Sequence, residues 1–209
     1  MAESAKKMAS WALGTFKNRS VPVMMLLYKT MVRSRLEYCS ALWNPHKIKD
    51  IQTLESIQRS FTRRIAGCQD MDYWDRLRYL KLPSLQRRRE RYIIINAWKI
   101  LNGKIPNDVE MKFYSSDRLG LRARVPPVSK NCPSSVQTLY DNSFSVKAAK
   151  LWNLLPKALN TIKELSLFKA ALGKFLDKIP DKPPTSGYTA ECSNSILDWN
   201  YQSGGLRDE

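Results

Sequence analysis

Apolar residues recur at helical spacing along most of the chain, and this periodicity constrains the fold more than any other feature. The clearest example is the segment from Ile48 to Ala66. Its apolar side chains fall within about 120° of one another when successive residues are placed 100° apart; they are Ile51, Leu54, Ile57, Phe61 and Ile65. Such a segment is typical of an amphipathic helix, and Gly67 is a natural stop after it.

Similar periodicity, bounded by residues that start or stop helices, predicts further helices. The stops include Asn44-Pro45, Pro83, Asn102-Gly103 and Pro156. The predicted helices are Ala2 to Lys17, Pro22 to about Trp43, Ile48 to Ala66, Asp70 to Leu82, Leu85 to Leu101, Ser143 to Leu155 and Leu165 to Ile179.

Changes in composition divide the chain. The predicted helix 85–101 continues after its arginines as YIIINAWKIL, which is apolar nearly all round and indicates a segment buried in the centre of a bundle. Prolines replace helical spacing in residues 104–142, where short strands such as Val136 to Tyr140 are predicted. We expect a basic helical region (1–103), this linker (104–142), a helical pair packing on the first region (143–180) and a flexible tail (181–209).

The predicted fold class is therefore mainly α. It is an irregular helical bundle with a proline-rich, partly extended middle segment and a flexible C-terminal tail. The 209 residues are enough to bury a core, as one large or two small domains.

Positive charge is concentrated in the first part of the chain. Residues 1–130 hold 26 Lys and Arg against 11 Asp and Glu, which accounts for 15 of the net +16 charges. Such an excess attracts polyanions, of which phosphate backbones are the commonest. A solvated surface that keeps the protein soluble is the alternative.

The strongest local motif is Gln86-Arg87-Arg88-Arg89-Glu90-Arg91 at a predicted helix start. Positive side chains oppose the helix dipole there and should cost stability unless an anion neutralises them. Phosphate oxygens would do so, and Arg87, Arg88, Arg89 and Arg91 are therefore predicted nucleic-acid contacts. Alternatively, Asp72 and Asp75 of the preceding helix pair with these arginines.

A second basic surface is predicted on the helix from Ile48. Lys49, Arg59, Arg63 and Arg64 crowd the side opposite its apolar face, which suits contact with a sugar-phosphate backbone but not the reading of bases. An ordinary solvated face is the alternative. Between the two basic motifs, Tyr73 and Trp74 could stack on unpaired bases, although such rings more often belong to the core.

The sequence predicts no catalytic residue, metal site or cofactor. It contains no glycine-rich phosphate loop, no G-x-S-x-G and no nucleophile–base pair. Its single histidine, His46, has no cysteine at ligand spacing, and its four cysteines are far apart. We expect an intracellular protein, in the nucleus or the cytoplasm, without a membrane span or a signal peptide.

Several segments in series resemble one family. LLYKTMVRSRLEYCSALWNP, LESIQRSFTRRIAG and YWDRLRYLKLPSLQRRRERYIIINAWKILNG resemble the region downstream of the polymerase domain in non-LTR retrotransposon reverse transcriptases of the jockey and CR1 type. SFSVKAAKLWNLLP and SLFKAALGKFL resemble the closing segments of those polyproteins. The resemblance covers about Lys6 to Leu176, with Pro83 standing where relatives more often carry a bulkier residue.

The resemblance implies the C-terminal, thumb-proximal helical part of an RNA-directed DNA polymerase, with RNA and DNA backbones as partners. It also allows a contact with the polymerase part of the parent polyprotein. The chain has no Asp-Asp pair, so the Tyr-x-Asp-Asp signature that holds the two catalytic metal ions is not in these residues. We therefore expect no enzyme activity from this chain alone.

Two other functions fit the sequence. Ile48 to Ala66 and Met71 to Leu80 flank a turn with Gly67, as in a helix-turn-helix DNA-binding protein, although Asp72 and Asp75 on the reading helix would repel phosphate. A non-catalytic helical interaction scaffold could instead use the basic residues on acidic partners or internal pairs.

Overall fold

The computed structural model describes residues 1–105, 114–115, 122–125, 133–183 and 193–202. Helices dominate these residues, which confirms the mainly α fold class. The chain divides into two units. The first comprises Met1–Arg89 and Asp181–Asn194, and the second comprises Glu90–Pro180 and Ser195–Glu209.

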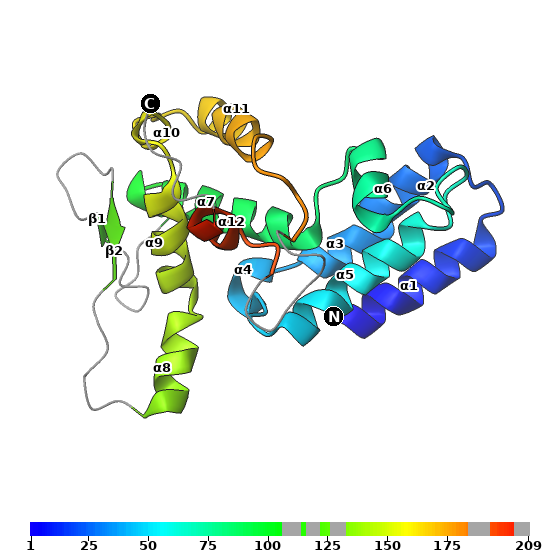
Figure 1. Ribbon diagram of the computed structural model, residues 1–209, viewed down its shortest axis with the longest axis horizontal. Coiled ribbons are helices and arrows are strands. Elements are labelled where there is room, and N and C mark those ends of the chain that lie inside the picture. The colour runs from blue at the N-terminus through cyan, green and yellow to red at the C-terminus, as the bar shows by residue number, and fades with distance from the viewer. Residues whose placement is uncertain (106–113, 116–121, 126–132, 184–192, 203–209) are drawn as a thin grey trace. The chain divides into compact units, whose positions relative to one another are not determined.

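The first unit is built from short helices around one core (Figure 1). In chain order they are α1 (Ala2–Thr15), α2 (Val21–Leu27), the π-helical η1 (Tyr28–Val32), α3 (Arg33–Glu37), α4 (Ser40–Trp43), α5 (Ile48–Thr62), α6 (Tyr73–Tyr79) and the first residues of α7 (Leu85–Leu101).

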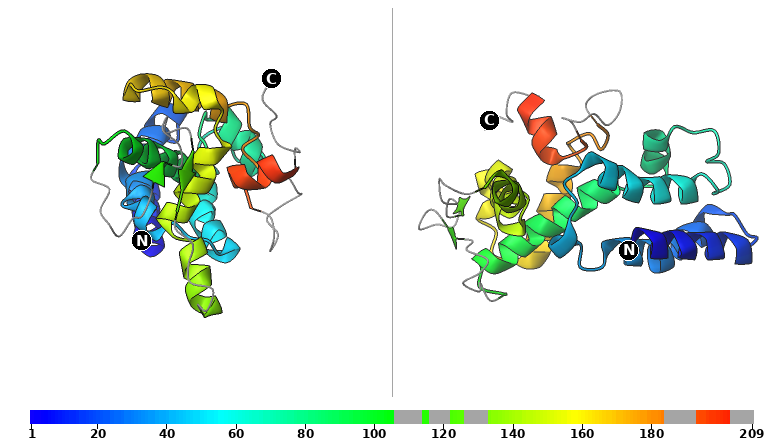
Figure 2. Two further views of the ribbon diagram at one scale, coloured as in Figure 1. Left: turned by 90° about the vertical axis from the view of Figure 1, so that its left-hand side faces the viewer. Right: turned by 90° about the horizontal axis from the view of Figure 1, so that it is seen from below.

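Small residues let α1 approach its neighbours closely. Ala5, Ala9 and Ala12 are buried and share one face of α1, which packs beside α5 and α3 (Figure 2). The predicted apolar face of α5 is buried against the same core, where the Phe61 ring lies 5.4 Å from that of Tyr28. Burying a side chain such as Phe61 contributes about 1.5–3 kcal/mol to stability.

The long helix predicted from Pro22 to Trp43 is interrupted. Pro22 lies in the first turn of α2, as expected, but the backbone then widens into η1 and breaks at Cys39, whose φ of 50° is left-handed. The indole Nε1 of Trp43 donates to Tyr38 O at 2.7 Å across this break. The segment is therefore broken into several short helices instead of forming one continuous helix.

The second unit contains the rest of α7 and the elements after it. They are β1 (Tyr114–Ser115), β2 (Ala123–Arg124), α8 (Ser134–Asp141), α9 (Phe144–Leu154), α10 (Lys157–Asn160), α11 (Leu165–Leu176) and α12 (Ile196–Gln202). The two strands pair antiparallel, with Tyr114 opposite Arg124.

Aromatic rings form the centre of the second unit. The Phe168 ring lies 5.7 Å from that of Trp98 and 6.0 Å from that of Trp152, so α7, α9 and α11 share one core. The Trp98 indole is satisfied by Ile162 O at 2.8 Å. The predicted packing of the helices around Ser143–Leu155 and Leu165–Ile179 is confirmed.

Three further predictions differ from the structure. Val136 to Tyr140 is not a strand but lies in α8. The helical pair packs on residues 93–100 of α7, which lie within the predicted region 1–103, but the two units divide at residue 89 and not at 103. Within the predicted tail, Asp181, Ser193 and Asn194 join the first unit and α12 is helical; residues 184–192 and 203–209, like most of the predicted linker, lie outside the described residues.

Candidate nucleic-acid interface

The exposed side of α5 and the turn after it carry a cluster of cations. Lys49, Arg59, Arg63 and Arg64, called here the α5 basic cluster, are all exposed, with the hydroxyls of Thr53, Ser56 and Ser60 between them. Among the described residues none of the four forms an ion pair with a carboxylate. From Lys49 to Arg63 the cluster extends roughly 20 Å, at 1.5 Å per residue.

A buried arginine holds the turn that follows α5. Arg76 is 2% exposed, and its guanidinium donates to Thr62 Oγ1 at 3.0 Å, to the carbonyl oxygens of Cys68 and Met71 at 3.2 Å, and to Arg59 O at 3.3 Å. Burial lowers the pKa of Arg76 from its ordinary value, but arginine stays charged in proteins. Charge-assisted hydrogen bonds thus fix the backbone that presents Arg63 and Arg64.

The ring of Tyr73 lies beneath the guanidinium of Arg59. The Arg59 guanidinium lies 4.6 Å above the Tyr73 ring, a cation–π distance. The ring is buried, and its hydroxyl donates to Glu55 Oε2 at 2.6 Å, so burial, followed by the Glu55 charge, raises the pKa of Tyr73. Trp74 is half-buried and packs on the same core, 4.8 Å from Tyr73. Both rings follow the core alternative considered from the sequence.

A backbone contact links the loop that carries Lys17 to the turn after α5. The Ala66 N–H donates to Arg19 O at 2.8 Å and brings the loop between α1 and α2 to the turn after α5. Lys17, two residues earlier, is exposed. This contact joins segments 47 residues apart, and no local pattern in the sequence signals it.

The position of the arginines on α5 makes them stable without a ligand. Arg59 is in the last turn and Arg63 directly follows it. Cations near a helix C-terminus gain about 0.3–1 kcal/mol from the helix dipole. The cluster can therefore remain exposed and charged in the free protein.

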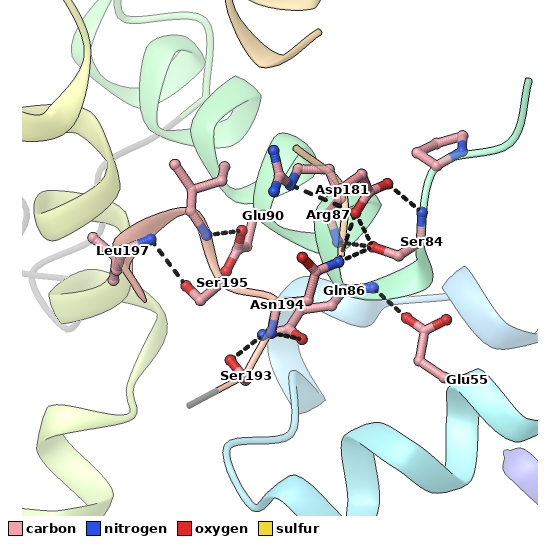
Figure 3. A network of polar contacts seen from close by, with 12 residues as sticks. Glu55, Ser84, Gln86, Arg87, Glu90, Asp181, Ser193, Asn194, Ser195 and Leu197 are labelled. Carbon is pink, nitrogen blue, oxygen red and sulfur yellow. Dashed lines mark hydrogen bonds and ion pairs between the residues drawn. The ribbon is translucent and has the colours of Figure 1, made fainter. Parts of the chain in front are cut away.

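At the start of α7 the protein supplies its own anions (Figure 3). Ser84 Oγ accepts from the Arg87 N–H at 3.1 Å and caps the helix. Glu55 accepts from the Gln86 N–H at 2.9 Å, and Asp181 accepts from the Ser84 N–H at 2.7 Å. Two carboxylates thus meet the positive end of the helix dipole.

The arginines of this motif face inward. Arg87 and Arg89 are 4% and 2% exposed, Arg87 Nε lies 3.9 Å from Asp181, and Arg89 Nε donates to Asn44 Oδ1 at 3.1 Å. Arg88 pairs with Glu37, with Nη2 and Oε2 2.9 Å apart. The protein's own oxygens therefore replace the phosphates predicted for Arg87, Arg88 and Arg89.

The internal network uses acids other than those considered from the sequence. Asp72 accepts from the Trp74 N–H at 3.0 Å as the cap of α6, and Asp75 pairs with Arg78 at 3.3 Å within that helix. Arg91 belongs to the second unit, where its guanidinium donates to Lys169 O at 3.1 Å. Of the predicted contacts, only the α5 basic cluster is presented to solvent as one group.

The helix-turn-helix alternative matches the structure poorly. That motif joins its helices by a turn of about 3–4 residues, whereas residues 63–72 separate α5 from α6. The second helix is short, and its exposed Arg78 is paired with Asp75.

The described residues contain neither a candidate metal site nor a candidate membrane span. No three His, Cys, Asp or Glu side chains among them are placed to hold a metal ion. No described helix combines the length and apolar character needed to cross a membrane.

Comparison of the chain with protein-family models, curated proteins and solved structures found no match.

Proposed function

We propose that the first unit binds the phosphate backbone of RNA or DNA through the α5 basic cluster. The observation that carries the proposal is that Lys49, Arg59, Arg63 and Arg64 lie exposed along one helix and its following turn, without carboxylate partners among the described residues. Cations on a rigid helix neutralise successive phosphates and release their counterions. Binding is electrostatic and weakly specific for sequence.

We further propose that the chain is the C-terminal part of a non-LTR retrotransposon reverse transcriptase polyprotein. The serial segments from Lys6 to Leu176 support this origin, and the mainly helical fold agrees with it. In such a polyprotein, RNA-directed DNA synthesis belongs to the polymerase part outside this chain. This chain then acts as an intracellular, non-catalytic binding module that contacts nucleic acid and the polymerase part.

The test is the salt dependence of binding to single-stranded RNA. Replacing Arg59, Arg63 and Arg64 together by glutamine should weaken binding and lower the slope of log K against log salt by about 2, at about 0.7 per phosphate contact on a single strand. Fluorescence anisotropy of a labelled oligonucleotide at several salt concentrations measures both quantities.

A matched control removes the same charge elsewhere. Lys163, Lys174 and Lys178 are exposed in the second unit, and their replacement by glutamine also removes three positive charges. If binding depends only on net charge, the two triple variants behave alike and the proposed site is refuted. A slope unaffected by the arginine substitutions refutes it as well.

The internal pairing of Arg33, Arg78 and Arg88 favours a second candidate, a helical interaction scaffold. In that case basic residues serve internal pairs and acidic protein partners. Filter binding with single-stranded RNA, duplex DNA and heparin separates the two functions, because a scaffold retains none of the three at physiological salt.

A further inference from the structure

A hollow in the first unit lies between α1 and α3, apart from the α5 basic cluster. Its lining includes Ser4, Lys7, Met8 and Trp11 from α1 and Arg35 from α3. Trp11 is 51% exposed, although tryptophan is usually mostly buried. Met1 and Glu3 also line it, so the hollow combines a large uncovered aromatic ring with two cationic side chains and one carboxylate.

The Trp11 ring contacts a second aromatic ring. The Phe16 ring meets it in a T-shaped contact, with the centroids 6.1 Å apart and the planes at 82°. This contact supports the indole from one side. A supported ring loses little conformational freedom when a second planar group stacks on it.

The two cations of the hollow can both receive a phosphate. Arg35 is half-buried, and its Nη1 donates to Met31 O at 2.7 Å, which leaves further guanidinium donors; it has no ion pair with a carboxylate among the described residues. Lys7 pairs with Glu3 at 3.1 Å, but these side chains are 78% and 80% exposed. Exposed pairs of this kind are weak, so an incoming phosphate can replace Glu3.

We infer that this hollow binds one unstacked nucleobase on Trp11, with its adjoining phosphate on Arg35 and Lys7. Bases inside a duplex have both faces covered by their neighbours, so the hollow selects single-stranded nucleic acid. The cations favour this occupant over an apolar polypeptide segment, which would leave them desolvated and unpaired. The inference rests on the proposed function and adds the class of strand to it.

Replacing Trp11 by alanine tests the inference. Because a base stacked on an aromatic side chain contributes to binding affinity, we expect Trp11→Ala to bind single-stranded RNA about tenfold more weakly. Duplex RNA of the same sequence should bind as before. The salt slope should also be unchanged, because Trp11 contacts no phosphate. Trp11→Phe retains a ring and should recover most of the affinity.

The control is Tyr79→Ala, which removes another exposed aromatic ring from the first unit. Circular dichroism confirms that each variant is folded. An unchanged affinity of Trp11→Ala for single strands would overturn the inference and leave the indole as a surface for another polypeptide. Equal losses for single strands, duplex and the Tyr79 variant would overturn it too.

The two proposals fail in different ways. If the arginine substitutions on α5 lower the salt slope while Trp11→Ala changes nothing, the hollow is not a base site and the backbone interface stands. If Trp11→Ala weakens single-strand binding while the arginine substitutions leave the slope unchanged, the α5 interface is refuted instead.

Discussion

Replacing Arg76 by methionine should lower the free energy of unfolding of the turn after α5. Methionine keeps an unbranched side chain of similar volume, although it is shorter than arginine, so only a small cavity is expected where the guanidinium lay. It removes every hydrogen bond that the guanidinium donates to the turn. The effect is therefore the cost of acceptors left without a donor.

The cost differs among the four acceptors of the Arg76 guanidinium. Arg59 O still accepts from the Arg63 N–H at 3.2 Å, and Thr62 Oγ1 still donates to Gln58 O at 2.8 Å. Met71 O also loses its donor, but Met71 is 37% exposed, so water can take the place of the guanidinium. Cys68 O, on a buried residue, keeps no other hydrogen bond within the described part of the chain. One buried acceptor without a partner costs about 1–3 kcal/mol, which is the expected loss in free energy of unfolding.

Hydrogen exchange of the backbone amides in residues 63–72, followed at increasing urea concentrations, measures this loss locally. Arg78→Met is the matched control, because Arg78 lies on the same helix but is 75% exposed and paired only with Asp75. Exposed pairs contribute about 0–1 kcal/mol. Equal exchange in the two variants would refute the role assigned to Arg76.

Two further predictions concern Glu55 and Gly67. Burial raises the pKa of Glu55 above its ordinary 4.5, so the folded state binds the carboxyl proton more tightly than the unfolded chain does. Protonation of Glu55 therefore stabilises the fold below pH 4.5, and this stabilisation is lost as the pH rises through the raised pKa. Urea unfolding across this pH range should show a smaller decline for Glu55→Gln than for the unsubstituted protein, and parallel profiles would contradict this. Gly67 has a φ of 77° with open space around it, so Gly67→Ala should cost about 1–2 kcal/mol from backbone strain alone, whereas Gly67→Asn should cost less in the same urea measurement.

The sequence predicts best those helices whose ends carry proline, glycine or a capping residue. The helix from Leu85 to Leu101 was predicted with its observed bounds, because Pro83-Ser84 precedes it and Asn102-Gly103 follows it. The break at Cys39 carries no glycine or proline, so the pattern around it still indicated a continuous helix. The segment Val136 to Tyr140 has β-favouring residues but is helical in the structure, where surrounding residues override this weak propensity.

The candidate site divides in the same way. The exposure of Arg59 and Arg63 follows from the helical periodicity of their own segment, which sequence reasoning can use. The burial of Arg87 and Arg89 depends on partners far away in the chain, such as Asn44 and Asp181, which no local pattern reveals. The sequence indicates that the arginines at the start of α7 need anions, but it does not indicate that Glu55 and Asp181 supply them.

The contacts of Asp181, Ser193 and Asn194 with the start of α7 affect when the first unit can finish folding and how it can be expressed. Gln86 Nε2 donates to Ser193 Oγ at 2.7 Å, and Asn194 Nδ2 donates to Asp181 Oδ1 at 2.6 Å. During translation, residues 90–180 leave the ribosome before these last pieces do, so the first unit can be completed only after most of the second has been synthesised. A recombinant fragment that stops at residue 103 would keep Glu55 but lack Asp181, one of the two carboxylates at the amino end of α7, and a useful minimal clone must extend at least to residue 194.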